Sequence, residues 1–164
     1  MKLLIGLSLL LCQAAFGDQI GNVTYTIDTA GEKWIAQDTY KAEGQEVITY
    51  TKEGESQSKW NELFTVQSAT GLRMSPKCFF DLFINQLKTL SSGKELKSQI
   101  TKEDDQELFA KWWIDDGSLD SQQEWIRIIQ HDDALIIFRF TSKNTKEADT
   151  KKKKAETLLK SAKL

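Results

Sequence analysis

Two β-prone stretches near the carboxyl end decide the fold, residues 123–130 (QEWIRIIQ) and residues 134–141 (ALIIFRFT). Both are rich in isoleucine and aromatic residues, and the His131-Asp132-Asp133 segment between them is typical of a turn. The pattern predicts an antiparallel hairpin in which Gln130 faces Ala134. That register divides the side chains into two faces: Ile126, Ile128, Ile136, Phe138 and Phe140 on one, and Trp125, Arg127, Ile129, Leu135, Ile137 and Arg139 on the other. Because both faces are largely apolar, we expect helices to cover the sheet on both sides.

More strands are predicted upstream of this hairpin. Short β-prone stretches separated by glycines lie at residues 23–28, 33–40, 46–52 and 62–68, and two further stretches lie at residues 96–100 and 107–114. Most of the chain should therefore form antiparallel sheet.

A helix is predicted at residues 75–92. Ser75 is suited to the N-cap and Pro76 to the first helical position, and Gly93 is suited to end the helix. At helical spacing the large apolar residues fall on one arc, so we expect one face to be buried: Phe79, Phe80, Phe83, Ile84, Leu87 and Leu90.

A second helix is predicted at residues 145–162, started by a capping box of Asn144 and Glu147. Its apolar arc is small and holds Ala148, Ala155, Leu158, Leu159 and Ala162. Lys151 also falls inside this arc, so its ammonium group would have to reach past apolar surface. The predicted order along the chain is a set of strands, a helix, a second set of strands and a second helix. This order is typical of an α+β sandwich, in which two main helices flank an antiparallel sheet.

The amino terminus has the features of a secretory signal peptide. Lys2 is followed by an apolar run from Leu3 to Leu11, and Ala15-Phe16-Gly17 offers small residues for cleavage after Gly17. This reading makes residues 1–17 a signal peptide and residues 18–164 a single domain, exported to the periplasm or beyond. A lipid anchor on Cys12 is the alternative, but Leu11 stands where a lipobox has a small residue.

Composition excludes several classes of protein. The chain has 164 residues, of which 40% are hydrophobic and 10% aromatic, so it should form a packed core and not a disordered segment. Its net charge of −2 is unevenly spread, since residues 143–164 carry 8 basic and 3 acidic residues and the rest is acidic. An acidic body argues against nucleic acid as a partner, and the basic helix could dock on that body or orient a partner.

No familiar catalytic motif is present, such as G-x-S-x-G, a P-loop or H-E-x-x-H. The single histidine, His131, stands beside two aspartates at the predicted turn, where we expect a solvated turn residue. Residues 115–120 resemble part of a calcium loop but lack its alternating order of ligands, so a polar loop is expected. We predict no cofactor and no metal site.

Four residues are candidates for a binding surface. Cys78 lies in the first turn of the predicted helix, where the helix dipole favours a thiolate, and it points away from the apolar stripe. Trp112 and Trp113 are adjacent, so on one strand they face opposite sides of the sheet and at least one lies in a second layer or at the surface. Trp60 is a further aromatic anchor candidate.

The layout of residues 33–142 with a closing helix resembles the PsbP-like fold shared with Mog-type Ran-binding proteins. The leader and the hairpin from Gln123-Glu124-Trp125 to Phe138-Arg139-Phe140 are also similar to small uncharacterised secreted proteins of Gram-negative intracellular bacteria of the Legionella type. The first resemblance implies a non-enzymatic binding or assembly role, and no functional residue carries over from either.

From these features we expect an exported, non-enzymatic binding protein whose partner is a protein or a small ligand. No stable membrane insertion is expected, and the chain should be a monomer or a weak homodimer. Two alternatives stay open: an enzyme that uses Cys78 or a pair of acidic residues, and a structural or assembly factor of the cell envelope.

Overall fold

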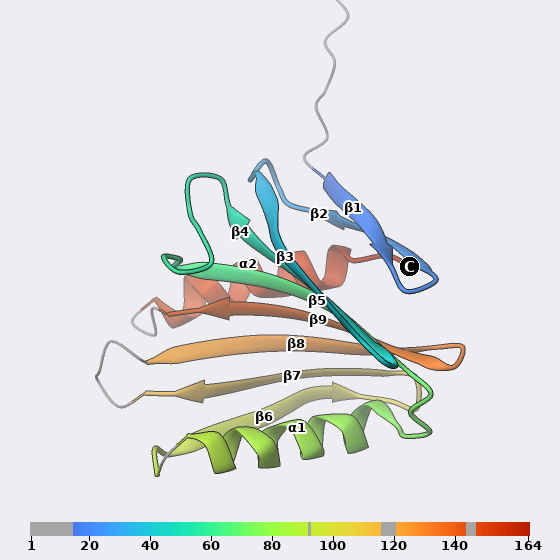
Figure 1. Ribbon diagram of the computed structural model, residues 1–164. Helices are drawn as coiled ribbons and strands as arrows, with labels where there is room; N and C mark the ends of the chain where they lie inside the picture. Colours follow the sequence, from blue (N-terminus) through green and yellow to red (C-terminus); the bar gives the residue numbers. More distant parts are fainter. Residues whose placement is uncertain (1–14, 92, 116–120, 144–146) are drawn as a thin grey trace, which may run out of the picture.

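A computed structural model describes residues 15–91, 93–115, 121–143 and 147–164 (Figure 1). Five strands come first: β1 (Ala15–Ile20), β2 (Val23–Asp28), β3 (Trp34–Ala42), β4 (Gln45–Lys52) and β5 (Glu62–Thr70). They are followed by α1 (Pro76–Leu90), β6 (Leu96–Glu103), β7 (Glu107–Ile114), β8 (Gln122–His131), β9 (Ala134–Ser142) and α2 (Ala148–Ser161). The predicted α+β class, with an antiparallel sheet and two main helices, is confirmed.

Seven of the strands form one antiparallel sheet in the order β3-β4-β5-β9-β8-β7-β6. Helix α1 packs on one face over β6, β7 and β8. Helix α2 and the separate β1-β2 hairpin cover the other face. The sheet therefore has a core on each side, as its two apolar faces predicted.

The register of the β8-β9 hairpin differs by one residue from the prediction, which was wrong. His131 pairs with Ala134, and the loop is Asp132-Asp133 with Asp132 at a φ of +51°. A two-residue loop fits the twist of the strands when its first residue has positive φ, which Asp tolerates. Since a one-residue shift exchanges the faces, the α1 side carries Ile126, Ile128, Leu135, Ile137 and Arg139, and the α2 side carries Trp125, Arg127, Ile129, Ile136, Phe138 and Phe140.

Helix α1 begins as predicted. The Ser75 side chain accepts a hydrogen bond from the Cys78 backbone N–H at 3.2 Å, and Pro76 follows the cap. Phe80 and Ile84 are the large residues that it buries. Leu90, predicted on the buried face, is exposed, and it is the last residue of the helix.

Helix α2 begins at Ala148, with Glu147 at the N-cap and no side-chain capping bond. Asn144, the predicted capping residue, lies outside the described residues. Ala155, Leu158, Leu159 and Ala162 are buried, as the apolar arc predicted, whereas Ala148 at the start of the helix is exposed. Among the described residues, no helix is both long enough and apolar enough to span a bilayer.

Strand β1 is an element that the sequence did not predict. It pairs with β2 along its whole length, from Ala15 opposite Asp28 to Ile20 opposite Val23. The leader interpretation assigns Ala15-Phe16-Gly17 to the signal peptide, whereas these residues form the first half of β1. The predicted cleavage after Gly17 stays a prediction, and it would divide β1.

Candidate functional site

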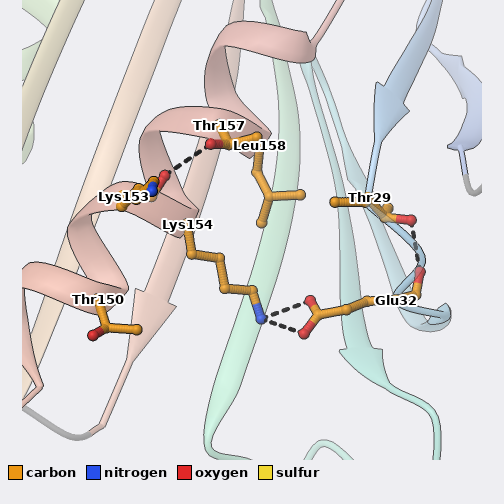
Figure 2. Close-up of a pocket in the computed structure, with 8 residues that line it drawn as sticks. Thr29, Glu32, Thr150, Lys153, Lys154, Thr157 and Leu158 are labelled. Atoms are coloured by element: carbon orange, nitrogen blue, oxygen red, sulfur yellow. Dashed lines mark hydrogen bonds and ion pairs between the residues drawn. The ribbon is translucent and has the colours of Figure 1, made fainter.

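A cleft of about 530 Å³ opens between α2 and the loop that joins β2 to β3 (Figure 2). The loop contributes Thr29, Ala30 and Glu32, and α2 contributes Thr150, Lys153, Lys154, Thr157 and Leu158. The volume lies within the range of small-molecule sites in proteins, about 300–1,000 Å³. We therefore take this cleft as the candidate functional site.

The loop side of the cleft is held by its own hydrogen bonds. Thr29 Oγ1 donates to the carbonyl oxygen of Glu32 at 2.6 Å, and the N–H of Ala30 donates to Asp28 Oδ1 at 2.9 Å. Ala30 has a φ of +50° and Gly31 a φ of +94°, so the chain turns sharply here. Positive φ is costly for alanine, and it persists only where the surrounding bonds enforce it. These hydrogen bonds hold the loop in the turn that forms this wall of the cleft.

A cluster of charged side chains holds α2 to the sheet and closes one end of the cleft. Glu62, only 1% exposed, accepts from Lys52 at 2.7 Å and from Lys154 at 2.6 Å, and it also pairs with Lys151. Glu32 contacts Lys154 at 2.6 Å and Lys52 at 3.0 Å. Figure 2 shows the contact between Lys154 and Glu32 across the end of the cleft. Three ammonium groups thus surround two carboxylates, which leaves the cluster with a net positive charge.

The pKa values follow from burial and these contacts. Burial alone would raise the pKa of Glu62, but hydrogen bonds from Lys151, Lys154 and Lys52 outweigh it and lower the pKa to about 2. Lys154 responds in the opposite sense, because burial lowers its pKa more than its carboxylate partners raise it. The pKa of Glu32 is lowered, since hydrogen bonds from Lys154 and Lys52 exceed the effect of its partial burial. Both carboxylates are therefore ionised at neutral pH.

The remaining walls of the cleft are largely hydrocarbon. Thr157 Oγ1 donates to the backbone carbonyl of Lys153 at 2.9 Å, and Thr29 Oγ1 donates to that of Glu32, so both hydroxyl groups have backbone partners. Ala30 and Leu158 add further apolar surface. Lys153 at the rim forms no ion pair with another described residue. The cleft combines apolar walls with positive charge, which suits a ligand that has an apolar body and an anionic group.

Sequence reasoning missed the charged cluster, although two signals pointed to it. By alternation, Glu62 shares the face of the apolar residues Phe64 and Val66. Lys151 falls inside the apolar arc of α2, and in the structure its ammonium group contacts Glu62. A lysine on a buried helix face and a glutamate on a buried strand face each require a partner of opposite charge.

The four predicted surface residues do not line this cleft. Trp112 is only 3% exposed, and its Nε1–H donates to the buried Glu124 at 2.9 Å, so this side chain does not lie at the surface. Trp113 is half-buried on the opposite face, with the Lys111 ammonium 4.8 Å from its ring centre. Trp60 is half-buried beside Lys143 at 4.2 Å, and Cys78 is exposed. A binding role for Trp113, Trp60 and Cys78 stays a prediction.

His131 and the acidic stretch 115–120 are the polar features that the sequence singled out. His131 is partly exposed near the β8-β9 turn, with its Nε2 3.8 Å from Asp132. Of the acidic stretch 115–120, residues 116–120 lie outside the described part of the chain. Within that part, no three side chains of His, Cys, Asp or Glu gather as a metal site would require.

The exposed thiol supports a direct prediction. Cys78 lies in the first turn of α1 and is exposed, so it should react with an aromatic disulfide reagent in the folded protein. Cys78 should liberate one equivalent of the reagent's thiolate without denaturant. The absorbance of this thiolate measures the reaction. A native protein that reacts only after denaturation would contradict the exposed position of Cys78.

A second hollow of about 360 Å³ lies on the opposite side of the sheet, beside α1. Its lining comes from α1, the segment before it and two strands: Gln45, Gln67, Leu72, Met74, Phe79, Leu82, Phe83 and Gln86. This lining contains no charged side chain, whereas the α2 cleft contains Glu32, Lys153 and Lys154. The α2 cleft is therefore the better candidate for a ligand that must be oriented as well as buried.

No protein-family model and no curated protein sequence matches the chain. Solved structures do match. The solution structure of PsbP from the cyanobacterium Synechocystis sp. PCC 6803 aligns with a TM-score of 0.59 over 98% of both chains, at 15% sequence identity. The chain has a PsbP-like fold.

Two structures of the protein Mog1 share this PsbP-like fold. A Mog1 mutant aligns with a TM-score of 0.56 over 91% of this chain and 95% of that chain, at 12% identity. The Ran-binding protein Mog1p of Saccharomyces cerevisiae aligns with a TM-score of 0.52 over 94% of this chain and 92% of that chain, at 14% identity. At these identities the likeness establishes the PsbP-like fold and leaves function to be argued from the site.

Proposed function

We propose that this PsbP-like chain is a non-enzymatic binding protein, and that its ligand has an apolar body with one anionic group. The observation that carries this proposal is the cleft between α2 and the β2-β3 loop, with largely apolar walls, a hydrogen-bonded loop and lysines in its lining. An apolar group of the ligand would lie against Ala30 and Leu158, and its anionic group would meet Lys153.

Two further lines support binding as the general role. One structural neighbour is named as a Ran-binding protein. A binding role is also consistent with the cleft that the β2-β3 loop and α2 form beside the sheet. The apolar run from Leu3 to Leu11 supports export, so we propose that the protein acts in the periplasm or beyond, as a small secreted protein of Gram-negative bacteria would.

A fluorescent amphiphile tests the site directly. Anilinonaphthalene sulfonate has an aromatic body and one anionic group, and it should bind the folded protein with saturable fluorescence that octanoate displaces. Thr157→Trp places a large side chain in the cleft from an exposed helix position and should weaken binding at least about tenfold. The near-ultraviolet circular dichroism of each variant checks that its fold is retained.

A charge reversal tests the anionic group separately. Lys153→Glu should weaken binding by about fivefold, because a partly exposed ion pair is worth about 1 kcal/mol. Lys152→Glu is the matched control, since this exposed lysine neighbours Lys153 in sequence but does not line the cleft. Equal affinity in wild type, Thr157→Trp and Lys153→Glu would overturn the site, and loss of binding on Leu82→Glu alone would place it in the α1 hollow instead.

A further inference from the structure

The residues around the predicted cleavage point belong to the folded domain. Strand β1 runs Ala15–Ile20, and its register pairs Ala15 with Asp28, Phe16 with Ile27 and Gly17 with Thr26. Half of the β1-β2 ladder therefore lies before Asp18. Cleavage after Gly17 would remove this half.

Phe16 takes part in the core on the α2 side of the sheet. Its ring lies 4.6 Å from the ring of Tyr50 and 5.8 Å from that of Phe64, with the second pair edge to face. It is partly buried and packs against the same cluster that holds Tyr25 and Phe138. These are favourable aromatic contacts that a chain starting at Asp18 would lack.

Gly17 is fitted closely to the opposite strand. A Cβ atom at this position would lie 2.5 Å from the carbonyl oxygen of Tyr25, so a residue other than glycine could not keep this approach. The small residue that suggested a cleavage point thus has a second explanation, which is the tight packing of β1 on β2. The sequence pattern alone does not separate the two.

We propose that the exported precursor is cut between Ala14 and Ala15, so that the mature chain keeps Phe16, Gly17 and every residue of β1 that the structure describes. Cys12 and Ala14 then occupy the −3 and −1 positions and are both small, as the cleaving peptidase requires. Water is added across the Ala14–Ala15 peptide bond, which leaves a carboxylate on Ala14 and an amino group on Ala15. The new positive charge lies opposite Asp28, its partner in the register, so the two ends of the ladder have complementary charges.

This proposal rests on export and is independent of the ligand, so its failure is distinguishable from failure of the binding site. The full-length chain is expressed in a Gram-negative host, and the protein from the periplasmic fraction is analysed by intact mass and N-terminal sequencing. The expected mature chain begins at Ala15. A chain that begins at Asp18, or one that keeps Met1, overturns the proposal.

A matched pair of variants checks which residues direct the cut. Ala14→Leu puts a bulky side chain at the −1 position of the proposed site and should abolish the product that starts at position 15. Ala15→Leu alters the −3 position of the rival site, after Gly17, and should leave cleavage after Ala14 intact. Normal processing of Ala14→Leu together with blocked processing of Ala15→Leu would assign the cut to Gly17 and overturn the proposal.

Discussion

Replacing Glu62 with glutamine is expected to lower the free energy of unfolding by about 3–5 kcal/mol, the usual cost of removing one partner from a buried ion pair. The carboxylate is 1% exposed and receives Lys52, Lys151 and Lys154. Glutamine keeps the size of the side chain but leaves these ammonium groups without their shared counter-charge. Two of them belong to α2, so this helix should lose much of its hold on the sheet.

Urea denaturation followed by tryptophan fluorescence measures this change. Glu147→Gln is the matched control, because Glu147 is an exposed residue that reaches Lys151 only at 4.0 Å. It should change stability by less than about 1 kcal/mol. If Glu62→Gln is as stable as Glu147→Gln, the cluster does not hold α2 and this account of the cleft is wrong.

The same cluster predicts a dependence on pH. Hydrogen bonds from the lysines lower the pKa of Glu62 to about 2 from the ordinary 4.5, despite the opposing effect of burial. A carboxylate with a lowered pKa in the folded state stabilises the protein fully above its ordinary value, and that contribution is lost as the pH falls towards 2. Wild type should therefore lose stability between about pH 5 and pH 2, and Glu62→Gln should lose less over this range.

Replacing Arg127 with glutamine is expected to cost about 2–3 kcal/mol, the range for hydrogen bonds made by a charged group. Arg127 lies on β8 and donates Nη1–H groups to the carbonyl oxygens of Leu159 and Ala162, both at 2.8 Å. It also contacts Glu107 at 2.7 Å. It thus satisfies carbonyls at the end of α2 that have no partner within the helix, while Glu62 holds the other half of the helix.

Hydrogen exchange at α2 distinguishes this role from a general loss of packing. In Arg127→Gln, amides in the last turn of α2 should exchange faster relative to those of β5 and β9. Lys102→Gln is the control, since exposed Lys102 pairs with the same Glu107 but does not reach α2. Uniform loss of protection across the sheet and both helices would contradict a local role for Arg127.

Most of the fold follows from local sequence patterns. Ser75-Pro76 placed the start of α1 correctly, and glycines with β-prone stretches located the strands from β2 to β9. The register of β8 on β9 was not predicted correctly. Alternation shows which side chains share a face within one strand, but it does not show which residues of two strands are paired. That choice depends on the turn, and Asp132 at positive φ makes a two-residue loop where three residues seemed available.

The candidate site was harder to predict for a physical reason. Its two walls, the β2-β3 loop and α2, lie more than 100 residues apart in the chain, and only the topology brings them together. Lys151 marked α2 as a helix that needs a buried acidic partner, but the sequence does not say which strand supplies it. The burial of Trp112 could not be predicted, because alternation shows that Trp112 and Trp113 face opposite sides of the sheet but not that α1 covers the side of Trp112.

The location of a bound amphiphile decides whether the α2 cleft is a binding site. In a two-dimensional NMR titration of the isotope-labelled protein with octanoate, we expect saturable shifts confined to the amides of Ala30, Glu32, Lys153, Thr157 and their neighbours. These shifts should be absent in Thr157→Trp. Shifts centred on Phe79 and Leu82 beside α1, or no saturable shifts at concentrations below the micelle threshold, would contradict the assignment of the α2 cleft as the binding site.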